Sequence, residues 1–150
     1  MKIHPSGTSL IQLMVVMAIL VIIAAVSFPR LTEYTNDLEL KNSTKALLAN
    51  LKLAQQKTVT EQVKYAVRLT PAGGSYFLVK KTVPEEVLAS WLLNNNVYFS
   101  TITGLVNNEA VYNFTGAVDF TGEVTLTHLD TAKQTLVEIK PSGYVSWQSQ

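Results

Sequence analysis

An unbroken apolar run near the start of the chain constrains this sequence more than any other feature. Residues 10–28 read LIQLMVVMAILVIIAAVSF, and only Gln12 and Ser27 among them are polar. In helical form the run would be about 28 Å long, because each residue adds about 1.5 Å. That length is close to the hydrocarbon thickness of a bilayer, about 30 Å. We therefore expect a transmembrane helix here.

Charges on both sides of the run predict its orientation. Lys2 and the initiator amine precede it. The first charged residues after Arg30 are acidic: Glu33, Asp37 and Glu39. Because positively charged flanks are retained on the cytoplasmic side, we expect the N-terminus in the cytoplasm and the rest of the chain outside it. The predicted location is a single pass through the inner (cytoplasmic) membrane.

A cleaved secretory signal is the alternative interpretation of the same run. Lys2 would supply its charged region, and the small residues at 25–27 its exit site. The apolar region would be long for such a signal, and the polar leader before Thr8 would have no role. Under this alternative the chain is an exported or membrane-anchored binding domain whose mature N-terminus lies near Phe28.

The residues at the start of the run form a motif. Gly7 is followed by Thr8, then by Leu10–Ile11 and Gln12, and Pro29 lies twenty-one positions after Thr8. This pattern resembles the N-terminal signal of the type IV pilin and pseudopilin superfamily, commonly written G-F-T-L-I-E. The resemblance implies cleavage between Gly7 and Thr8 by prepilin peptidase, N-terminal methylation, and helices that pack together in a filament core. The implied partners are other pilin or pseudopilin subunits, that peptidase and the inner-membrane assembly platform.

Two positions depart from the family pattern. Thr8 stands in place of the usual Phe, and Gln12 in place of the usual Glu. In the family the Glu carboxylate offsets the N-terminal amine of a neighbouring subunit. Gln12 keeps hydrogen-bonding capacity but lacks the ionic contribution. Since a subunit with no predecessor has no amine to neutralise, we expect a minor, initiating or tip-associated subunit. Drift in a minor subunit with relaxed demands remains the alternative explanation of Gln12.

The sequence after the apolar run predicts an amphipathic helix. Residues 31–58 contain no Gly or Pro. Four residues fall on one helical face: Leu40, Leu47, Leu51 and Ala54. Three lysines lie off that face: Lys41, Lys45 and Lys52. We expect one rod of roughly 50 residues, with a bend or local loosening near Pro29 because proline removes a helical donor.

Strands are predicted from residue 62 onward. Residues 62–83 alternate in polarity around a turn at 71–74, which indicates a hairpin. Further strands are predicted at 97–102, 111–114, 124–129, 135–139 and 144–147. Residues 85–93 are ambiguous, and a short helix with Trp91 on its apolar face is one interpretation. The predicted fold is α+β, with a long N-terminal helix, membrane half plus amphipathic half, packed on an antiparallel β-sheet domain.

The predicted organisation has four parts. They are a leader at 1–7, a transmembrane or filament-core helix at 8–29, an amphipathic helix at 30–60 and a β-rich globular domain at 61–150. The later part resembles GspH-type minor pseudopilins of type II secretion and FimT-like minor pilins. The matching segments are Leu51–Val59, Val63–Val67, Phe114–Gly116, Val124–Leu126, Val137–Ile139 and Gly143–Val145. The resemblance leaves open a type II pseudopilus or a type IV or competence pilus, in the periplasm or outside the cell.

Residues that carry enzyme chemistry are sparse. The chain has no cysteine, which excludes a disulfide, a thiol nucleophile and a cysteine-bound metal. Of its two histidines, His4 lies in the leader, and His128 is expected to be a surface or satisfied residue. Glu85 and Glu86 are expected to be a solvated helix start rather than an acid–base pair. We therefore expect no enzyme, cofactor or metal.

The distribution of basic residues disfavours nucleic acid as a partner. The net charge is +1, and no Lys or Arg follows Lys140. The basic doublet Lys80–Lys81 is expected to be an exposed sheet edge, whereas neutralising a phosphate backbone takes several clustered cations. A DNA-binding minor pilin of natural transformation remains a second alternative.

Overall fold

The computed structural model describes residues 9–149, apart from the side chains of Val26 and Pro29. Gly7 and Thr8, the predicted processing site, lie outside the described residues. The chain divides into two compact units, and the boundary between Thr35 and Asn36 falls inside the first helix.

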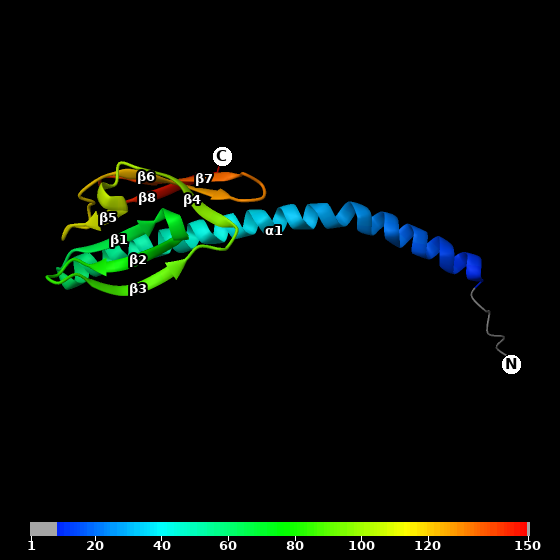
Figure 1. Cartoon of the computed structure of the whole chain (residues 1–150), viewed down its shortest axis with the longest axis horizontal. Coiled ribbons are helices and arrows are strands. Elements are labelled where there is room, and N and C mark those ends of the chain that lie inside the picture. Colours follow the sequence, from blue (N-terminus) through cyan, green and yellow to red (C-terminus); the bar gives the residue numbers. More distant parts are fainter. Residues whose placement is uncertain (1–8, 150) are drawn as a thin grey trace, which may run out of the picture. The chain divides into compact units, whose positions relative to one another are not determined.

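That helix, α1, runs without interruption over 52 residues, Leu10–Glu61 (Figure 1). Its sequence contains no glycine and only one proline, Pro29. Proline has no N–H to donate to the carbonyl of Ala25, yet the helical backbone continues through it. The helix is therefore not broken at Pro29, and the bend or loosening expected there stays a prediction.

The second unit includes the amphipathic part of α1. The predicted apolar face is confirmed: Leu40 is 5% exposed, Leu51 is 1% exposed, and Leu47 and Ala54 are fully buried. Thr44 and Thr58 lie on the same buried face, and their hydroxyls donate to the carbonyls of Leu40 (2.8 Å) and Ala54 (2.9 Å). These polar side chains are thus satisfied without interrupting the apolar contact.

Within the described residues, eight strands follow α1 and form two antiparallel sheets. The first sheet has the order β3-β2-β1-β5, with β1 Tyr65–Thr70, β2 Ser75–Lys80, β3 Glu86–Leu92 and β5 Glu109–Tyr112. The second has the order β4-β6-β7-β8, with β4 Val97–Thr103, β6 Gly122–His128, β7 Gln134–Ile139 and β8 Val145–Ser149. Two short 3-10 helices, η1 Pro71–Gly73 and η2 Val106–Asn108, join strands.

The buried face of α1 and the inner faces of both sheets form one hydrophobic core. Residues alternate along β1, so Tyr65, Val67 and Leu69 share the face that joins this core. The fold class predicted from the sequence, a long N-terminal helix packed on an antiparallel β-sheet domain, is confirmed.

Local predictions succeeded where turn chemistry was explicit. The hairpin expected over 62–83 is β1–β2, in which Thr70 lies opposite Ser75. It turns through Gly74, whose φ of +57° favours glycine. The hairpin expected from 124–129 and 135–139 is β6–β7, paired from Gly122 opposite Ile139 to Thr127 opposite Gln134.

Residues 80–93 settle one open question and contradict one prediction. The segment that the sequence left ambiguous is strand β3, and Trp91 stacks on Tyr76 of β2 with ring centroids 5.5 Å apart. Lys80 and Lys81 do not form an exposed edge, because β2 is an interior strand between β3 and β1. In both cases sheet neighbours that are distant in sequence decided the outcome.

Candidate functional site: the exposed apolar half of the helix

The candidate site begins at the first turn of α1. The carbonyl of Ser9 accepts the backbone N–H groups of Gln12 (2.9 Å) and Leu13 (3.2 Å). Leu10 and Ile11 are 77% and 70% exposed. The structure thus places three predicted assembly residues, Leu10, Ile11 and Gln12, together in the opening turn, three to five positions after Gly7 in the sequence.

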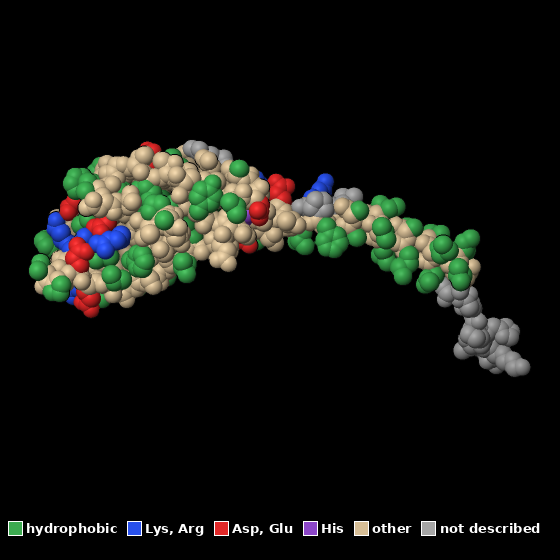
Figure 2. All heavy atoms as spheres, in the orientation of Figure 1, with side chains coloured by type: hydrophobic (Ala, Val, Ile, Leu, Met, Phe, Trp, Pro, Cys, Tyr) green, Lys and Arg blue, Asp and Glu red, His purple; other side chains and the backbone are tan. Residues whose placement is uncertain are grey.

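Apolar side chains are exposed all round the first unit of α1. Large residues at consecutive positions from Leu13 to Val16 are each at least half exposed, as are Ile19 to Ile23 and Phe28. Consecutive residues of a helix point about 100° apart, so these side chains cover every side of it. Figure 2 shows them as hydrophobic side chains along this part of α1. Such a segment is stable only if lipid or other apolar helices surround it.

Hydroxyl groups at the end of the run are satisfied within the helix. Ser27 Oγ donates to the carbonyl of Ile23 (2.9 Å), and Thr35 Oγ1 donates to that of Thr32 (2.8 Å). Within residues 10–26 the polar side chain is that of Gln12. It still needs an external hydrogen-bonding partner. Among the described residues, α1 is the one helix long and apolar enough to cross a membrane.

A second cluster ties two loops of the β domain to α1 near Asn36. Glu39 Oε2 accepts a hydrogen bond from Asn96 Nδ2 (3.0 Å) and lies 3.4 Å from His128 Nε2. His128 is fully buried, and its Nδ1 accepts the N–H of Asp130 (3.2 Å), which assigns the proton to Nε2. His128 is thus a satisfied buried residue that holds the β6–β7 turn on the helix.

Four charged residues form a network over the first sheet that sequence reasoning did not predict, although Lys81 and Glu85 had been considered singly. Arg68 donates to Glu85 (2.7 Å) and to the buried carboxylate of Glu109, and Lys81 pairs with both carboxylates. Hydrogen bonds from Lys81 and Arg68 lower the pKa of Glu85, and those to Glu85 and Glu109 raise the pKa of Arg68. The expectation that Glu85 begins a solvated helix is therefore wrong. Arg68 lies opposite Glu109 across β1 and β5. The spacing of these two residues in the sequence does not predict this pairing.

The far end of α1 carries another network. Tyr65 donates to Glu61, which also accepts from Lys57 (3.0 Å). Burial, with a smaller contribution from Glu61, raises the pKa of Tyr65 to about 12. The hydrogen bond from Tyr65, followed by that from Lys57, lowers the pKa of Glu61. Lys80 Nζ also lies 3.7 Å from Glu61. Lys80 and Lys81, the basic doublet of the sequence, are therefore both engaged in ion pairs within the domain.

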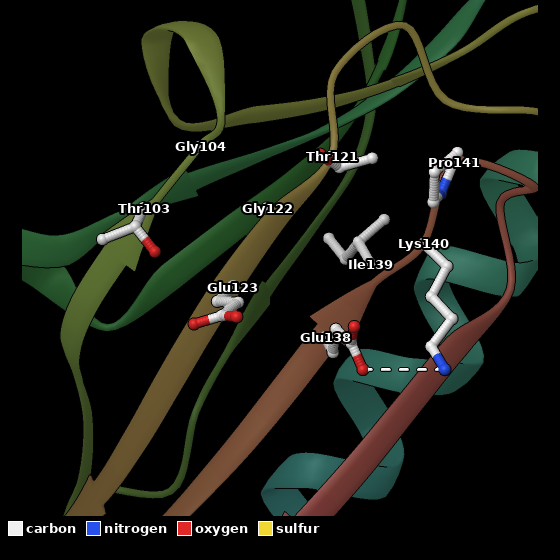
Figure 3. Close-up of a pocket in the computed structure, with 9 residues that line it drawn as sticks. All are labelled: Thr103, Gly104, Thr121, Gly122, Glu123, Glu138, Ile139, Lys140 and Pro141. Carbon is white, nitrogen blue, oxygen red and sulfur yellow. Dashed lines mark ion pairs between the residues drawn. The ribbon is translucent and has the colours of Figure 1, made fainter.

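A shallow depression of about 400 Å³ lies at one end of the second sheet (Figure 3). Glu123 and Glu138 face each other across β6 and β7, and Lys140 Nζ lies 3.8 Å from Glu138. Its remaining lining comes from Thr103, Gly104, Thr121, Gly122, Ile139 and Pro141. Among residues 9–149, no three His, Asp or Glu side chains gather as metal ligands would. The depression is polar surface, and the exposed apolar helix is the stronger candidate site.

Comparison with solved structures identifies the class of fold. The minor pseudopilin EpsH from the type 2 secretion system of Vibrio cholerae matches with a TM-score of 0.64 at 12% identity, over 74% of this chain and 97% of that one. The type IV minor pilin FimU of Pseudomonas aeruginosa matches with a TM-score of 0.62 at 12% identity, over 77% and 92%. No family profile and no curated protein sequence matches.

The chain therefore has the fold of the type IV pilin and pseudopilin superfamily. Within that class, the structures it resembles are of minor subunits, one from a secretion system and one from a pilus. At these identities the likeness shows the fold, and a membrane-anchored chain with an external domain fits both that fold and the apolar helix.

Proposed function

We propose that this chain is a minor pilin or pseudopilin subunit. Prepilin peptidase cleaves it between Gly7 and Thr8, and the exposed apolar half of α1 holds it in the inner membrane until assembly. One observation carries the proposal: the described side chains of residues 10–28 are apolar and exposed on all sides, apart from Gln12 and Ser27, while the same helix continues into the core of a β domain with the pilin fold. The filament is a type II secretion pseudopilus or a type IV pilus.

The continuity of α1 supports this proposal over an ordinary signal peptide. Signal-peptidase cleavage near Phe28 would cut the helix in its interior, between turns that are helical on both sides. Cleavage after Gly7 would leave the whole helix intact and place a new amine at Thr8, four residues before Gln12 in the sequence. Burying that amine in an apolar filament core is costly unless it is neutralised or hydrogen-bonded.

Gln12 supports an initiating or tip-associated position. Its amide oxygen can accept a hydrogen bond from an ammonium group, but it carries no opposite charge. A subunit at the start of a filament has no preceding amine to compensate. We therefore assign this chain to the start or tip rather than to the repeating shaft, with Leu10, Ile11 and Pro29 contributing to helix packing.

The mature N-terminus tests the processing step. We expect mass spectrometry of the full-length protein, expressed with a prepilin peptidase, to find a chain beginning at Thr8, with or without an added methyl group. Gly7→Val should leave the leader attached, whereas Ser9→Ala, two residues on, should be processed normally. A mature chain beginning near Phe28 would establish an ordinary signal peptide, and an uncut chain would establish a plain anchor.

The filament position is tested by Gln12→Glu. We expect this variant to enter filaments in greater amount than the native protein, because it restores the ionic contribution to an incoming amine. Gln12→Leu, which removes hydrogen bonding as well, should not show this increase. Immunogold labelling of the native protein should mark filament ends, and abundant labelling along the whole shaft would refute the tip assignment.

A further inference from the structure

The charged residues on the second half of α1 differ in whether they are paired. Its three acidic residues contact partners within their own domain: Asp37 with Lys133, Glu39 with His128 and Asn96, and Glu61 with Lys57, Tyr65 and Lys80. Three lysines, Lys41, Lys45 and Lys52, are exposed instead. The side chain of none of the three makes an ion pair or a hydrogen bond with another residue in the described part of the chain.

These lysines form a line on the helix, which we call the lysine stripe. At 3.6 residues per turn, Lys41, Lys45 and Lys52 fall within about 40° of one another around α1 and span about 16 Å along it. Exposed Val59 lies on the same line. Residues 40–58 contain no Asp or Glu, so nothing on this segment compensates the stripe.

A solvated helix face of the usual kind has a different pattern. Exposed helices commonly alternate Glu and Lys four residues apart, an arrangement that stabilises the helix. Lys41 and Lys45 are also four apart but carry like charges, which destabilises the helix slightly. Asp37 lies four residues before Lys41 but pairs with Lys133, and Glu39 and Glu61 also have partners within the domain. The stripe is thus a surface of one charge sign on an otherwise ordinary helix.

We propose that the lysine stripe docks against an acidic surface of a different pilin-like subunit in the same filament. This inference rests on the proposed function, since it names the partner of the same assembling helix. Charge complementarity carries the choice of an acidic partner. The stripe lies on the helix whose first half is the candidate assembly segment, so neighbouring subunits would approach it.

A second copy of this chain fits the stripe poorly. Two stripes that faced each other would repel. The β domain has three carboxylates without a described partner, and they are scattered: Glu86 in β3, Glu123 in β6 and Asp130 in the β6–β7 turn. A line of three ammonium groups is complementary to carboxylates that also lie in a line. These three carboxylates do not form a line. The stripe therefore favours a mixed contact over self-association.

Zero-length cross-linking tests the proposal directly. A carbodiimide joins an amine to a carboxylate only when the two are in contact, so filaments containing the full chain are treated with it and digested for mass spectrometry. We expect Lys41, Lys45 or Lys52 to be linked to an Asp or Glu of another subunit. Lys64 and Asp119, whose charged atoms lie 2.8 Å apart within the chain, provide the internal control for the reaction.

Charge variants supply the second measurement. The triple variant Lys41→Gln, Lys45→Gln, Lys52→Gln should reduce the amount of the protein in sheared filaments about five- to tenfold, given the modest strength of exposed ion pairs. The corresponding Lys→Arg triple should retain it. A control that lowers the net charge equally, Thr101→Glu, Thr103→Glu, Gln148→Glu on exposed strand positions, should also retain it.

The outcomes separate this inference from the proposed function. Absence of the native protein from filaments would overturn the proposed function. Native incorporation together with cross-links only to a second copy, or with the Lys64–Asp119 link alone, would overturn the stripe as a mixed subunit contact. Stripe-dependent binding of the full chain to duplex DNA or to phosphatidylglycerol vesicles, without the cross-link to another subunit, would also overturn it.

Discussion

Residues 10–28 and residues 40–58 of α1 are segments of equal length in one continuous helix, yet their side chains have opposite surroundings. The first segment has no charged residue and exposes its large apolar side chains all round. The second has four lysines and hides a single apolar face against two sheets. Backbone hydrogen bonding is the same in both, so the difference lies entirely in how apolar residues are distributed around the helix.

That difference shows which contacts stabilise each segment. The second segment completes its hydrophobic contacts within its own chain, and it should stay folded with the β domain whatever surrounds it. The first segment has no such contacts among the described residues of its unit, and it needs a membrane or a bundle of similar helices. Substitutions of one residue type should therefore have different effects in the two segments.

The largest expected effect comes from truncating a buried leucine. Leu51→Ala should lower the free energy of unfolding of the β domain by about 2–5 kcal/mol, because it leaves a cavity in a closed core. Leu20→Ala, at a site that is 55% exposed, should change that free energy by less than about 0.5 kcal/mol. Urea unfolding in detergent micelles measures both, since the two tryptophans, Trp91 and Trp147, lie in the β domain. Equal losses would contradict the comparison.

Introducing a charge should have its larger effect in the first segment, whereas truncating a leucine has its larger effect in the second. Val21→Arg, in the middle of the exposed apolar run, should oppose membrane insertion by about 2.5–3.5 kcal/mol. Ala46→Arg, at an exposed position of the second segment, should have no effect on insertion. The membrane-bound fraction after carbonate extraction distinguishes them. Normal insertion of the Val21→Arg protein would mean that residues 10–28 do not cross the bilayer as one span.

How the second segment is anchored can be tested at its contact with the β5–β6 and β7–β8 connections. Gln55 Nε2 donates to the carbonyl of Gly116 (2.6 Å), and Gly143 has a φ of +78°. A Cβ at Gly143 would lie 2.0 Å from that carbonyl oxygen. Gly143→Ala should therefore cost about 2 kcal/mol or more of β-domain stability. Gly73→Ala, whose Cβ would meet its nearest neighbour at 3.5 Å, is the matched control and should be nearly neutral.

The two segments also differ in how far the sequence alone could describe them. Periodicity identified Leu40, Leu47, Leu51 and Ala54 correctly, because a helix brings residues three, four and seven apart onto one face. The exposed run was recognisable from composition, and the motif from Gly7 to Gln12 indicated the superfamily whose fold the structure shows. These are local signals that neighbouring residues carry by themselves.

Contacts between distant residues could not be predicted in this way. The segment 85–93 contains apolar residues compatible with either a helix or a strand, and pairing with β2 decided for the strand. Glu109 is buried between Arg68 and Lys81, which are 41 and 28 positions away in the sequence. Which charged residues pair depends on the order of the strands in each sheet. The spacing of residues in the sequence does not predict that order.

The smallest expected effect concerns the end of the second segment, where Tyr65 and Glu61 meet. The folded state raises the pKa of Tyr65 to about 12, against an ordinary value near 10, mainly by burial. Between these values the unfolded chain releases the tyrosine proton and the folded chain keeps it. The contribution of Tyr65 to the free energy of unfolding is therefore fully present below about pH 10. It declines as the pH rises toward 12, by at most about 1.4 kcal/mol per pH unit.

Tyr65→Phe should reduce that alkaline decline, because a phenylalanine has no proton to release in either state. Urea unfolding followed by tryptophan fluorescence between pH 9 and about pH 11.5 measures the slope. Tyr144→Phe, which removes a hydroxyl from a residue that is 60% exposed, is the control and should leave the slope unchanged. If the Tyr65→Phe protein lost stability as steeply as the native one, the decline would originate elsewhere in the β domain, and the end of the second segment would not be its pH-sensitive point.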